Sequence, residues 1–325
     1  MTETITIRSY RPGDVKALVA LINQADAVDK QERATTPAEL EHEISFPGQR
    51  PETDCFLALD GDRLVGYSRL FLRPGHGRTD STVYCWGVVH PQWRRRGLGR
   101  RLLERSYERA RAYLSEFGTG TVYFQCNGQD VEGDRGALFE DLGLEPVRYW
   151  IVMARSLNGD LPQVQLPAGI RLRTFDPDRD VETVWRVDNT AFRDHWNATD
   201  STLEEFQHWL EKPCIRAELW FLAEDEASGE VVGLGLNVID PDYMAQTGRQ
   251  EGYVDTIAVL RAYRRRGLGT ALLAQSLQAL RQAGMEAAAL DADAENLTGA
   301  TRIYERMGFQ VRKTGIAYQK VMQKG

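Results

Sequence analysis

The sequence predicts a mixed α/β (α+β) fold that is built twice along the chain. Its 325 residues are enough for two ordinary domains. The hexapeptide RRRGLG stands at 94–99 and again at 264–269, and other segments match at a similar spacing. Within each copy, alternating apolar residues typical of strands are interleaved with segments of helical periodicity. We therefore predict two similar halves, each with a sheet that has helices on both of its faces.

The matched segments predict the same order of elements in both halves. Each half begins with a short strand, a turn with Pro and Asp, and an amphipathic helix. A hairpin follows, then an apolar strand that leads into the arginine motif, and finally a similar closing segment. The predicted order in each half is β-α-β-β-β-α-β-α-β. The matched segments are 5–23, 56–72, 83–91 and 138–147 in the first half, and 169–189, 220–238, 254–262 and 303–312 in the second.

The boundary between the halves is predicted in SLNGDLPQVQLPAG, at 156–169. This stretch is rich in Gly, Pro and polar residues and has no periodicity, as is typical of linkers. We expect an N-terminal domain at 1–157 and a C-terminal domain at 168–325.

The composition excludes several classes of protein. A net charge of -7 argues against a general nucleic-acid binder, so the arginine runs are interpreted as local features. No apolar run reaches the roughly 18 residues that a membrane span needs, and the N-terminus has no secretory signal. The four cysteines are widely spaced without a Cys-x-x-Cys pair. This favours free thiols in a reducing cytoplasm and argues against a metal site.

The RRRGLG motif joins a predicted strand to the start of an amphipathic helix. Unpaired backbone N–H groups gather at a helix N-terminus, and the helix dipole adds partial positive charge. Glycines let an anion approach the backbone closely, and arginines can donate charge-assisted hydrogen bonds. We interpret the motif as a pyrophosphate site, with a solvated arginine cluster as the alternative. A Walker loop would need a lysine after its glycines and a dinucleotide fingerprint would need a third glycine, and the motif has neither.

The pattern Arg-x-x-Gly-x-Gly between strand and helix resembles the acetyl-CoA motif of the GNAT N-acetyltransferase superfamily. LDADAENLTGATRIYERMGF, at 290–309, is similar to a second family motif, with an Asn after a strand and then a helix with Tyr and Gly-Phe. Two such domains in one chain resemble the mycothiol synthases, which acetylate a cysteinyl amine. The resemblance implies two tandem GNAT-type domains, each a mixed, mostly antiparallel sheet flanked by helices, with acetyl-CoA as the cofactor.

The resemblance also implies which residues contact acetyl-CoA. In this family the strand before the motif separates from its neighbour, and the pantetheine arm lies in the gap. The Val259 N–H would polarise the thioester carbonyl, and Asn296 would contact the pantetheine or order its loop. The implied cofactor residues of the second half are Ile257, Ala258, Val259, Arg264, Arg265, Arg266, Gly267, Leu268, Gly269, Thr270 and Asn296. Those of the first half are Val88, Val89, Arg94, Arg95, Arg96, Gly97 and Gly99.

Attack of an amine on the acetyl thioester needs a base, an oxyanion donor and an acid. The family's commonest acidic position falls on Tyr253. Asp255, two residues further along the strand and on the same face, is therefore the candidate base, and Glu251 is the second choice. The resemblance places Tyr304 near the sulfur, where its hydroxyl would protonate the leaving thiolate. The alternatives are a carboxylate bonded only to its neighbours and a tyrosine that only packs against the sheet.

The two halves differ at these positions, which predicts one catalytic domain. Phe139 aligns with Tyr304, and Cys85 stands on the strand face that carries Asp255 in the second half. We expect catalysis in the C-terminal domain, and an N-terminal domain that keeps the phosphate motif without the proton chemistry. That domain is expected either to bind CoA structurally or to support the fold.

The acceptor pocket is predicted in the loop after the first helix of the second half. Asp194, His195 and Trp196 are its candidate residues, with packing as the alternative interpretation. The predicted function is an acetyl-CoA-dependent N-acetyltransferase that acts on a primary amine of a small molecule. A protein or peptide N-acetyltransferase and a non-catalytic CoA-binding regulatory protein are the alternatives. We expect a cytoplasmic monomer or homodimer with no metal, nucleic-acid or membrane partner.

Overall fold

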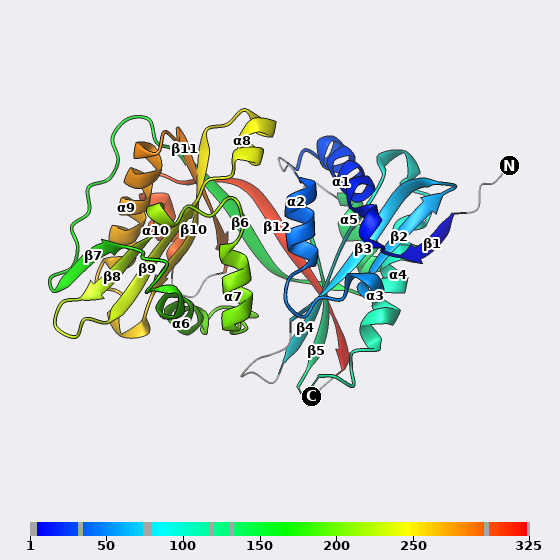
Figure 1. The fold of residues 1–325 in the computed structure, drawn as a ribbon, viewed down its shortest axis with the longest axis horizontal. Helices are drawn as coiled ribbons and strands as arrows, with labels where there is room; N and C mark the ends of the chain where they lie inside the picture. The colour runs from blue at the N-terminus through cyan, green and yellow to red at the C-terminus, as the bar shows by residue number, and fades with distance from the viewer. Residues whose placement is uncertain are drawn as a thin grey trace. The chain divides into compact units, whose positions relative to one another are not determined.

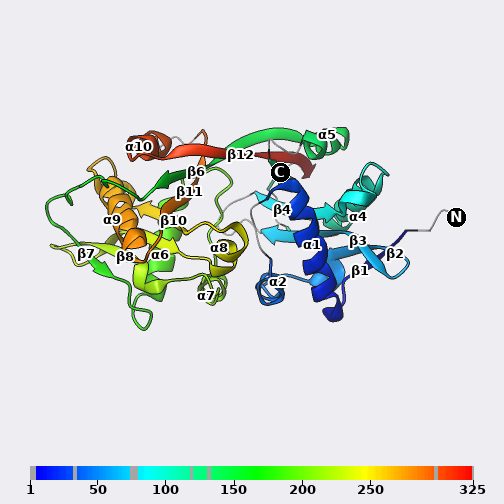
Figure 2. The same ribbon diagram turned by 90° about the horizontal axis from the view of Figure 1, so that it is seen from above.

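The computed structural model describes residues 5–31, 35–73, 80–117, 120–129, 133–295 and 299–323. The chain forms two compact units, an N-terminal unit of residues 1–148 and 315–325 and a C-terminal unit of residues 149–314. Figure 1 traces the elements of both units along the chain, and Figure 2 gives a second view of them. Each unit combines a mixed, mostly antiparallel sheet with flanking helices, which confirms the predicted fold class.

The described part of the N-terminal unit has its strands in the order β1-β2-β3-β4-β5-β12. Neighbouring strands are antiparallel except for β4 and β5, which run parallel. The strands are β1 (Thr6–Ser9), β2 (Cys55–Asp60), β3 (Arg63–Arg73), β4 (Ser81–Val89), β5 (Val122–Gln129) and the later part of β12 (Gln310–Gln323). The helices are α1 (Val15–Asp29), α2 (Pro37–Ile44), α3 (Pro51–Asp54), α4 (Leu98–Arg111) and α5 (Gly133–Asp141), with 3-10 turns η1 (Pro12–Asp14) and η2 (Pro91–Trp93).

The described part of the C-terminal unit has its strands in the order β6-β11-β10-β9-β8-β7. Here β10 and β11 are the parallel pair. The strands are β6 (Glu145–Ser156), β7 (Ile170–Thr174), β8 (Phe221–Asp225), β9 (Val231–Val238), β10 (Glu251–Val259) and β11 (Ala287–Asp293). The helices are α6 (Val181–Phe192), α7 (Leu203–Leu210), α8 (Pro241–Thr247), α9 (Leu268–Gln282) and α10 (Ala300–Arg306), with 3-10 turns η3 (Ala217–Leu219) and η4 (Arg261–Tyr263).

Both halves of the sequence contain the predicted order of elements, with two short helices added in each. The additions are α2 and α3 in the first half, and α7 and α8 in the second. Three of the four begin with a proline, whose fixed φ suits the first turn of a helix. Helices of two turns or fewer show too little periodicity to be predicted from sequence. Within the described ranges, no helix is both long and apolar enough to cross a membrane.

Helices cover both faces of each sheet. In β9, Leu234 and Leu236 pack in a cluster with α6 and α7. Gly233 and Gly235 face α9 instead, and a β-carbon on Gly233 would meet Leu272 at 3.1 Å. Because side chains alternate along a strand, α6 and α9 lie on opposite faces of the sheet. The C-terminal unit thus has the predicted three layers.

The last strand of each sequence half belongs to the compact unit of the other half. Residues 150–156 of β6 pair antiparallel with the whole of β11, in the C-terminal unit. Residues 315–323 of β12 pair antiparallel with β5, in the N-terminal unit. The predicted halves, 1–157 and 168–325, therefore differ from the compact units by one strand each. Strands pair through backbone groups that every sequence shares, so a repeat does not reveal which sheet a terminal strand joins.

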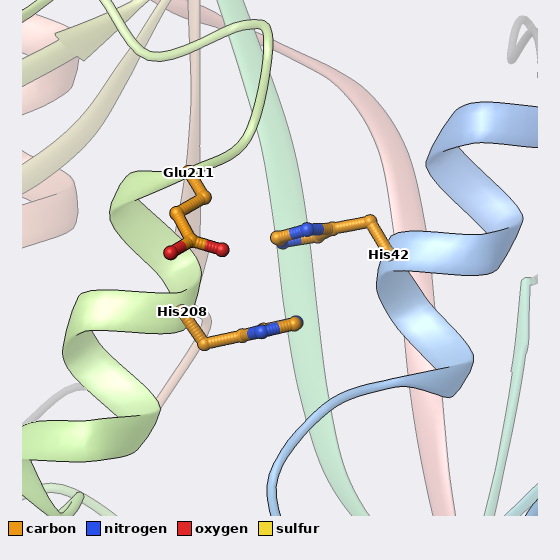
Figure 3. A group of neighbouring side chains, drawn as sticks. All are labelled: His42, His208 and Glu211. Carbon is orange, nitrogen blue, oxygen red and sulfur yellow. The ribbon is translucent and has the colours of Figure 1, made fainter.

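Two histidines occupy the last turns of short helices. His42 lies at the end of α2, and His208 lies at the end of α7 with Glu211 at its C-cap (Figure 3). The partial negative charge of a helix C-terminus interacts favourably with a cationic side chain. Both histidines are therefore suited to stabilise the helix that carries them.

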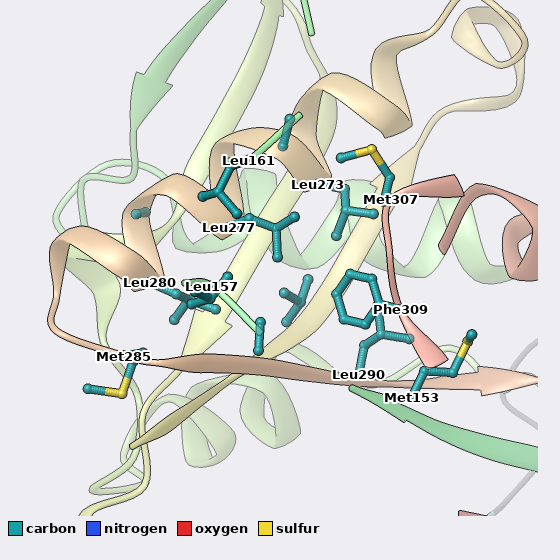
Figure 4. Close-up of a cluster of buried hydrophobic side chains, with 14 of the residues drawn as sticks. Met153, Leu157, Leu161, Leu273, Leu277, Leu280, Met285, Leu290, Met307 and Phe309 are labelled. Carbon is teal, nitrogen blue, oxygen red and sulfur yellow. The ribbon is translucent and has the colours of Figure 1, made fainter. Parts of the chain in front are cut away.

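The core of the C-terminal unit includes residues that come from the predicted linker. Leu157 and Leu161 belong to the buried cluster that includes Leu277 and Leu280 of α9, and Met153 of β6 lies beside Leu290 in the same cluster (Figure 4). Leu157 is fully buried and Leu161 is 6% exposed. The start of the segment 156–169 is thus part of the packed core. A single apolar residue every few positions is enough to anchor such a segment, although it gives no periodic signal.

Replacing Tyr318 of β12 by alanine is expected to destabilise the N-terminal unit, although this residue lies near the C-terminus of the chain. Tyr318 is 6% exposed, and its ring contacts that of Phe139 edge-on at a centroid distance of 5.3 Å. Removing a buried aromatic side chain costs about 3–5 kcal/mol. Amide hydrogen exchange should therefore show a loss of protection in β4 and β5 that is larger than any loss in β8 and β9.

The matched control is Val321→Ala, which changes a 43% exposed residue of the same strand. This variant is expected to exchange like the wild type. A loss of protection in Tyr318→Ala that is confined to β8 and β9 would contradict the assignment of this part of β12 to the N-terminal unit.

Candidate active site

The candidate site lies where two parallel strands of the C-terminal unit separate. β10 pairs with β11 from Glu251 to Tyr253, and Tyr253 is opposite Ala289. Beyond this point β11 remains paired with β6 as far as Asp293, and β10 remains paired with β9 as far as Val259. The edge of β10 that faces β11 is therefore left open over its last residues.

The equivalent strands of the N-terminal unit stay paired for longer. The repeat aligns Val83 of β4 with Tyr253 and Phe124 of β5 with Ala289. In the N-terminal unit the parallel pairing continues for two more residues, to Cys85 opposite Cys126. The opening therefore starts two residues earlier in the C-terminal unit.

A β-bulge marks the start of this opening on β10. The register with β9 shifts between Val254 and Thr256, which leaves Asp255 as the extra residue. β4 pairs with β3 from Thr82 to Val89 without a shift. A bulge bends its strand and redirects a side chain, and such bulges are common next to active sites. Only the C-terminal copy of the repeat has this feature at the described position.

The backbone of β10 directs an N–H group into the opening. The Leu260 N–H donates to the Val232 carbonyl, towards β9, at 3.0 Å. Because N–H groups alternate in direction along a strand, the Val259 N–H points to the opposite side, where β11 has separated. The Val259 carbonyl accepts a hydrogen bond from Arg264 Nε at 3.0 Å. This is the orientation that polarisation of a thioester carbonyl by Val259 requires.

The first arginine of each RRRGLG copy binds protein groups with its side chain. Arg264 Nη1 donates to the Asp194 carboxylate at 2.8 Å, and Nη2 donates to the Ala191 carbonyl at 2.7 Å. This joins the end of β10 to the end of α6. The hydrogen bond from Arg264 also lowers the pKa of Asp194. Arg264, which was predicted to bind phosphate, is thus paired with Asp194, which was predicted to border the amine substrate.

The N-terminal copy has the same arrangement. Arg94 Nε donates to the Val89 carbonyl at 3.0 Å, and its two terminal nitrogens donate to the Asp29 carboxylate at 2.6 and 2.8 Å. Asp29 is the last residue of α1. A contact that recurs in both copies is a feature of the repeated fold, so the first arginine positions the loop in both units. The sequence predicted this residue as a phosphate ligand, and its partner at the end of α1 or α6, far away along the chain, was not visible in the motif.

The loop that follows has a strained backbone in both copies. Arg265 has a φ of 62° and Gly267 a φ of 85°, and the equivalent Arg95 and Gly97 have 60° and 75°. A non-glycine residue in this left-handed region costs on the order of 1–3 kcal/mol and is concentrated at functional sites. Left-handed residues in a turn aim successive N–H groups into one concavity, which suits an anion. The backbone therefore supports the predicted pyrophosphate site more directly than the first arginine does.

The two copies differ in what lies over the second glycine of the motif. A β-carbon on Gly269 would have only ordinary contacts, at 3.7 Å from Val259 and 3.9 Å from Ile257. A β-carbon on Gly99 would meet Leu138 of α5 at 3.2 Å. The space next to Gly269 is thus free of the following helix, whereas α5 packs over Gly99.

Ion pairs also join the N-terminal motif to α5. Arg95 lies 3.0 Å from Asp134, and Arg100 lies 3.1 Å from Asp141. In the C-terminal unit no ion pair between the described residues links Arg265 or Arg266 to α10, and the Arg266 guanidinium stacks on the Tyr263 ring at 5.2 Å instead. Among the described residues, the following helix thus contacts the N-terminal motif and not the C-terminal one, although the two motifs have the same exposure residue by residue.

The predicted acid lies in the C-terminal unit on α10. Tyr304 is half-buried against the core, and its ring is 6.2 Å from that of Phe309. Desolvation raises the pKa of its hydroxyl, and no described residue forms a hydrogen bond with it. Phe139, the aligned residue, is 7% exposed and packs on Tyr318. Asn296, which was predicted to contact the pantetheine, lies outside the described residues.

The two predicted bases have different surroundings. Asp255 is exposed, and it accepts a hydrogen bond from Thr256 Oγ1 at 3.0 Å. Desolvation by the surrounding protein raises its pKa, while the Thr256 hydroxyl opposes this shift. Glu251 is buried, and its two oxygens accept from the Tyr243 hydroxyl at 2.8 Å and from Arg312 at 2.7 Å. Asp255 is therefore the carboxylate that is available to a substrate.

The two other predicted acceptor residues follow Asp194. His195 is partly buried, contacts Phe192 edge-on at 4.6 Å, and has its pKa lowered by desolvation and by Arg264. Trp196 is 37% exposed. Both lie at the end of α6, on the sheet face opposite α9.

Sequence reasoning missed one carboxylate at the opening. Asp291 lies on β11 two residues beyond Ala289 and is exposed. Desolvation raises its pKa, and its interaction with the Tyr253 hydroxyl opposes this shift. The repeat aligns Asp291 with Cys126, and this replacement of a buried thiol by a carboxylate was the available signal.

Comparison with known proteins shows the family of the chain. A model described as the acetyltransferase (GNAT) family matches residues 20–126 and 181–309. The chain belongs to this family. A mycothiol acetyltransferase from Thermobispora bispora is 32% identical over 321 residues, which cover 98% of this chain and 100% of the relative. One from Streptomyces coelicolor is 28% identical over 315 residues, which cover 97% and 94%.

Solved structures with the same fold include tandem GNAT proteins. A GCN5-related N-acetyltransferase from Sphaerobacter thermophilus has a TM-score of 0.77 and 26% identity, covering 99% of this chain and 96% of that one. A tandem GNAT protein from the clavulanic acid biosynthesis pathway has a TM-score of 0.71 and 19% identity, covering 99% and 100%. This GNAT chain is an acetyl-CoA-dependent N-acetyltransferase that acts on a primary amine of a small molecule.

Gly269→Ala is expected to weaken acetyl-CoA binding without loss of stability. The added methyl group has room in the ligand-free protein, and Ala is favoured over Gly within a helix by about 0.5–1 kcal/mol. The same methyl group would separate a phosphate from the first N–H groups of α9. We expect at least a tenfold weaker acetyl-CoA affinity by calorimetry, or about 1.4 kcal/mol, with an equal or higher melting temperature.

Gly13→Ala serves as the matched control, because this glycine lies in η1 with no atom within 4 Å of the added β-carbon. It should bind acetyl-CoA like the wild type. Unchanged affinity in Gly269→Ala would show that the phosphates do not bind at this helix start.

Proposed function

We propose that the acceptor is the primary amine of a mycothiol precursor and that the chemistry takes place in the C-terminal unit. Relatives named mycothiol acetyltransferase that match over most of the chain support this acceptor. One observation supports the location. β10 and β11 separate after Tyr253, and the Val259 N–H points into the space between them.

In this proposal the cofactor lies along the open edge of β10. The pyrophosphate binds the N–H groups of the loop and of the first turn of α9, where Gly269 leaves room for it. Arg265 and Arg266 add charge, and Arg264 fixes the loop through Asp194. The thioester then lies beside Ile257 and Ala258, and its carbonyl oxygen accepts a hydrogen bond from the Val259 N–H. This donor is part of a paired strand, so it needs no rearrangement when the oxyanion forms.

Asp255 acts as the base in this proposal. An alkylammonium ion must lose a proton before its nitrogen can attack. The bulge exposes the Asp255 carboxylate at the point where the strands separate. Its raised pKa makes it a better proton acceptor than an ordinary aspartate near neutral pH. Glu251 remains bound to Tyr243 and Arg312 and is given no role in proton transfer.

Tyr304 acts as the acid. Its hydroxyl has no protein partner among the described residues, and its ring is fixed by the core. A free hydroxyl at a fixed position can donate to the CoA thiolate as the C–S bond breaks and then regain a proton from solvent. In the N-terminal unit Phe139 has no proton to donate and α5 packs over the motif. We therefore propose one catalytic site per chain.

His195 and Trp196, at the end of α6, are proposed to border the acceptor. They follow Asp194, which the Arg264 contact holds close to the end of β10. Four free cysteines fit a reducing compartment, and a cytoplasmic location is part of the proposal.

The acceptor is tested by following CoA release from acetyl-CoA with the cysteinyl amine precursor of mycothiol and with a set of simple primary amines. We expect the precursor to have the highest kcat/KM. Turnover of other small amines without turnover of the precursor would contradict this acceptor and leave the enzyme class intact.

Tyr304→Phe is expected to lower kcat by about 10²–10⁴-fold with little change in either KM, because only the proton donor is removed. The hydroxyl makes no hydrogen bond with a described residue, so the melting temperature should stay within error of the wild type. Steady-state kinetics and thermal unfolding measure both effects. Tyr123→Phe on β5 is the control and should keep wild-type kinetics. Wild-type kcat in Tyr304→Phe would remove this residue from the mechanism.

Asp255→Asn is expected to abolish most activity while it raises the melting temperature at pH 7. The pKa of this carboxyl is raised in the folded protein, so its ionised form destabilises the fold at neutral pH. The increase in melting temperature should shrink as the pH falls through the raised pKa. It should vanish where the wild-type carboxyl is protonated in both the folded and the unfolded state. Thermal unfolding from pH 3 to pH 8 tests the sign, and a lower melting temperature at pH 7 would contradict it.

A further inference from the structure

Asp291 faces the same opening as Asp255, from the opposite strand. Tyr253 and Ala289 are the last paired residues of β10 and β11, and each aspartate lies two residues further along its own strand. Both carboxylates are close enough to the Tyr253 hydroxyl to act on it electrostatically. The three side chains therefore gather on one face of the sheet at the point of separation.

In the N-terminal copy of the repeat, the aligned positions lie where the two strands are still paired. The aligned residues Cys85 and Cys126 are register partners and are 5% and 1% exposed. There the strands remain closed by a pair of buried thiols. In the C-terminal unit both positions carry exposed carboxylates. Both replacements occur in the copy that has the bulge and whose second motif glycine is not covered by the following helix.

The charged groups around the two carboxylates are few. Asp255 interacts with Lys212, which follows α7, and with Asp291. Asp291 interacts with Arg312 of β12 and with the Tyr253 hydroxyl. No described cation forms a salt bridge with either carboxylate within 4.0 Å. Two carboxylates without a close cation suit a ligand that brings a positive charge of its own.

We propose that Asp291 is a second acceptor-binding carboxylate, which holds the ammonium group of the acceptor while Asp255 removes its proton. This inference rests on the proposed function. Tyr253 orients Asp291 and is a positioning residue. A carboxylate pair attracts the cationic acceptor more strongly than the neutral amide product, so it favours substrate entry and product release.

The proton balance is complete with these residues. The ammonium group gives one proton to the Asp255 carboxylate, and the neutral amine forms the C–N bond at the thioester carbon as the C–S bond breaks. The nitrogen then loses its second proton to solvent, and the CoA thiolate gains one from Tyr304. One proton is released overall for each acetyl group transferred.

The test compares Asp291→Asn with the wild type, using acetyl-CoA and the cysteinyl amine precursor. We expect the KM of the amine to rise at least tenfold while the KM of acetyl-CoA is unchanged. In Asp291→Asn the acid limb of the pH profile of kcat/KM should move to lower pH. The negative charge of Asp291, which raises the pKa of Asp255, is then absent. Asp291→Glu keeps the charge and should restore the acid limb to its wild-type position. Unchanged amine KM and an unmoved acid limb would overturn the inference.

Asp178→Asn, on the exposed turn before α6, is the matched control and should behave like the wild type. A second readout does not depend on turnover. In an NMR titration of labelled aspartate carboxyls, the pKa of Asp255 should fall in Asp291→Asn, and an unchanged value would overturn the pairing. Failure of the wild type to acetylate this amine would instead contradict the proposed acceptor, and the carboxyl titration would then still decide whether the two aspartates act as a pair.

Discussion

The proposed function depends on hydrogen bonds that two parallel strands do not form. An unpaired strand edge exposes N–H and C=O groups that need partners. In the C-terminal unit β10 leaves β11 after Tyr253, while β9 holds its other edge. One edge of β10 is therefore held by β9, while no described strand pairs with its other edge beyond Tyr253. A ligand with a chain of amide groups, such as the pantetheine of acetyl-CoA, can take the place of the missing strand.

Other features of the site keep this edge in position. Arg264 binds the carbonyl at the end of β10 and the end of α6 together, and Arg94 does the same for β4 and α1. The left-handed arginine that follows is strained, and these contacts offset part of that strain. The scaffold is thus kept in both copies of the repeat. The chemistry differs, because Tyr304, Asp255 and Asp291 are replaced by Phe139, Cys85 and Cys126 in the N-terminal copy.

Much of the fold follows from local sequence signals, and the remainder depends on contacts between distant segments. The repeated RRRGLG motif and the alternating strands predicted both sheets and the order of their main helices, because these signals are periodic. The exchange of β6 and β12 was missed because backbone pairing carries no side-chain signature. The partner of Arg264 was missed because Asp194 lies on an element far from it in sequence. Asp291 was overlooked because an aspartate on a strand has no motif of its own, and only the comparison with Cys126 reveals it.

We propose that acetyl-CoA occupies the open edge of β10, and that the N-terminal motif stays empty because α5 packs over Gly99. Amide hydrogen exchange with and without acetyl-CoA tests it most directly, because exchange reports each backbone segment separately. We expect new protection at 257–270 and unchanged exchange at 87–100. Protection at 87–100 in place of 257–270, or at neither segment with saturating acetyl-CoA, would contradict it.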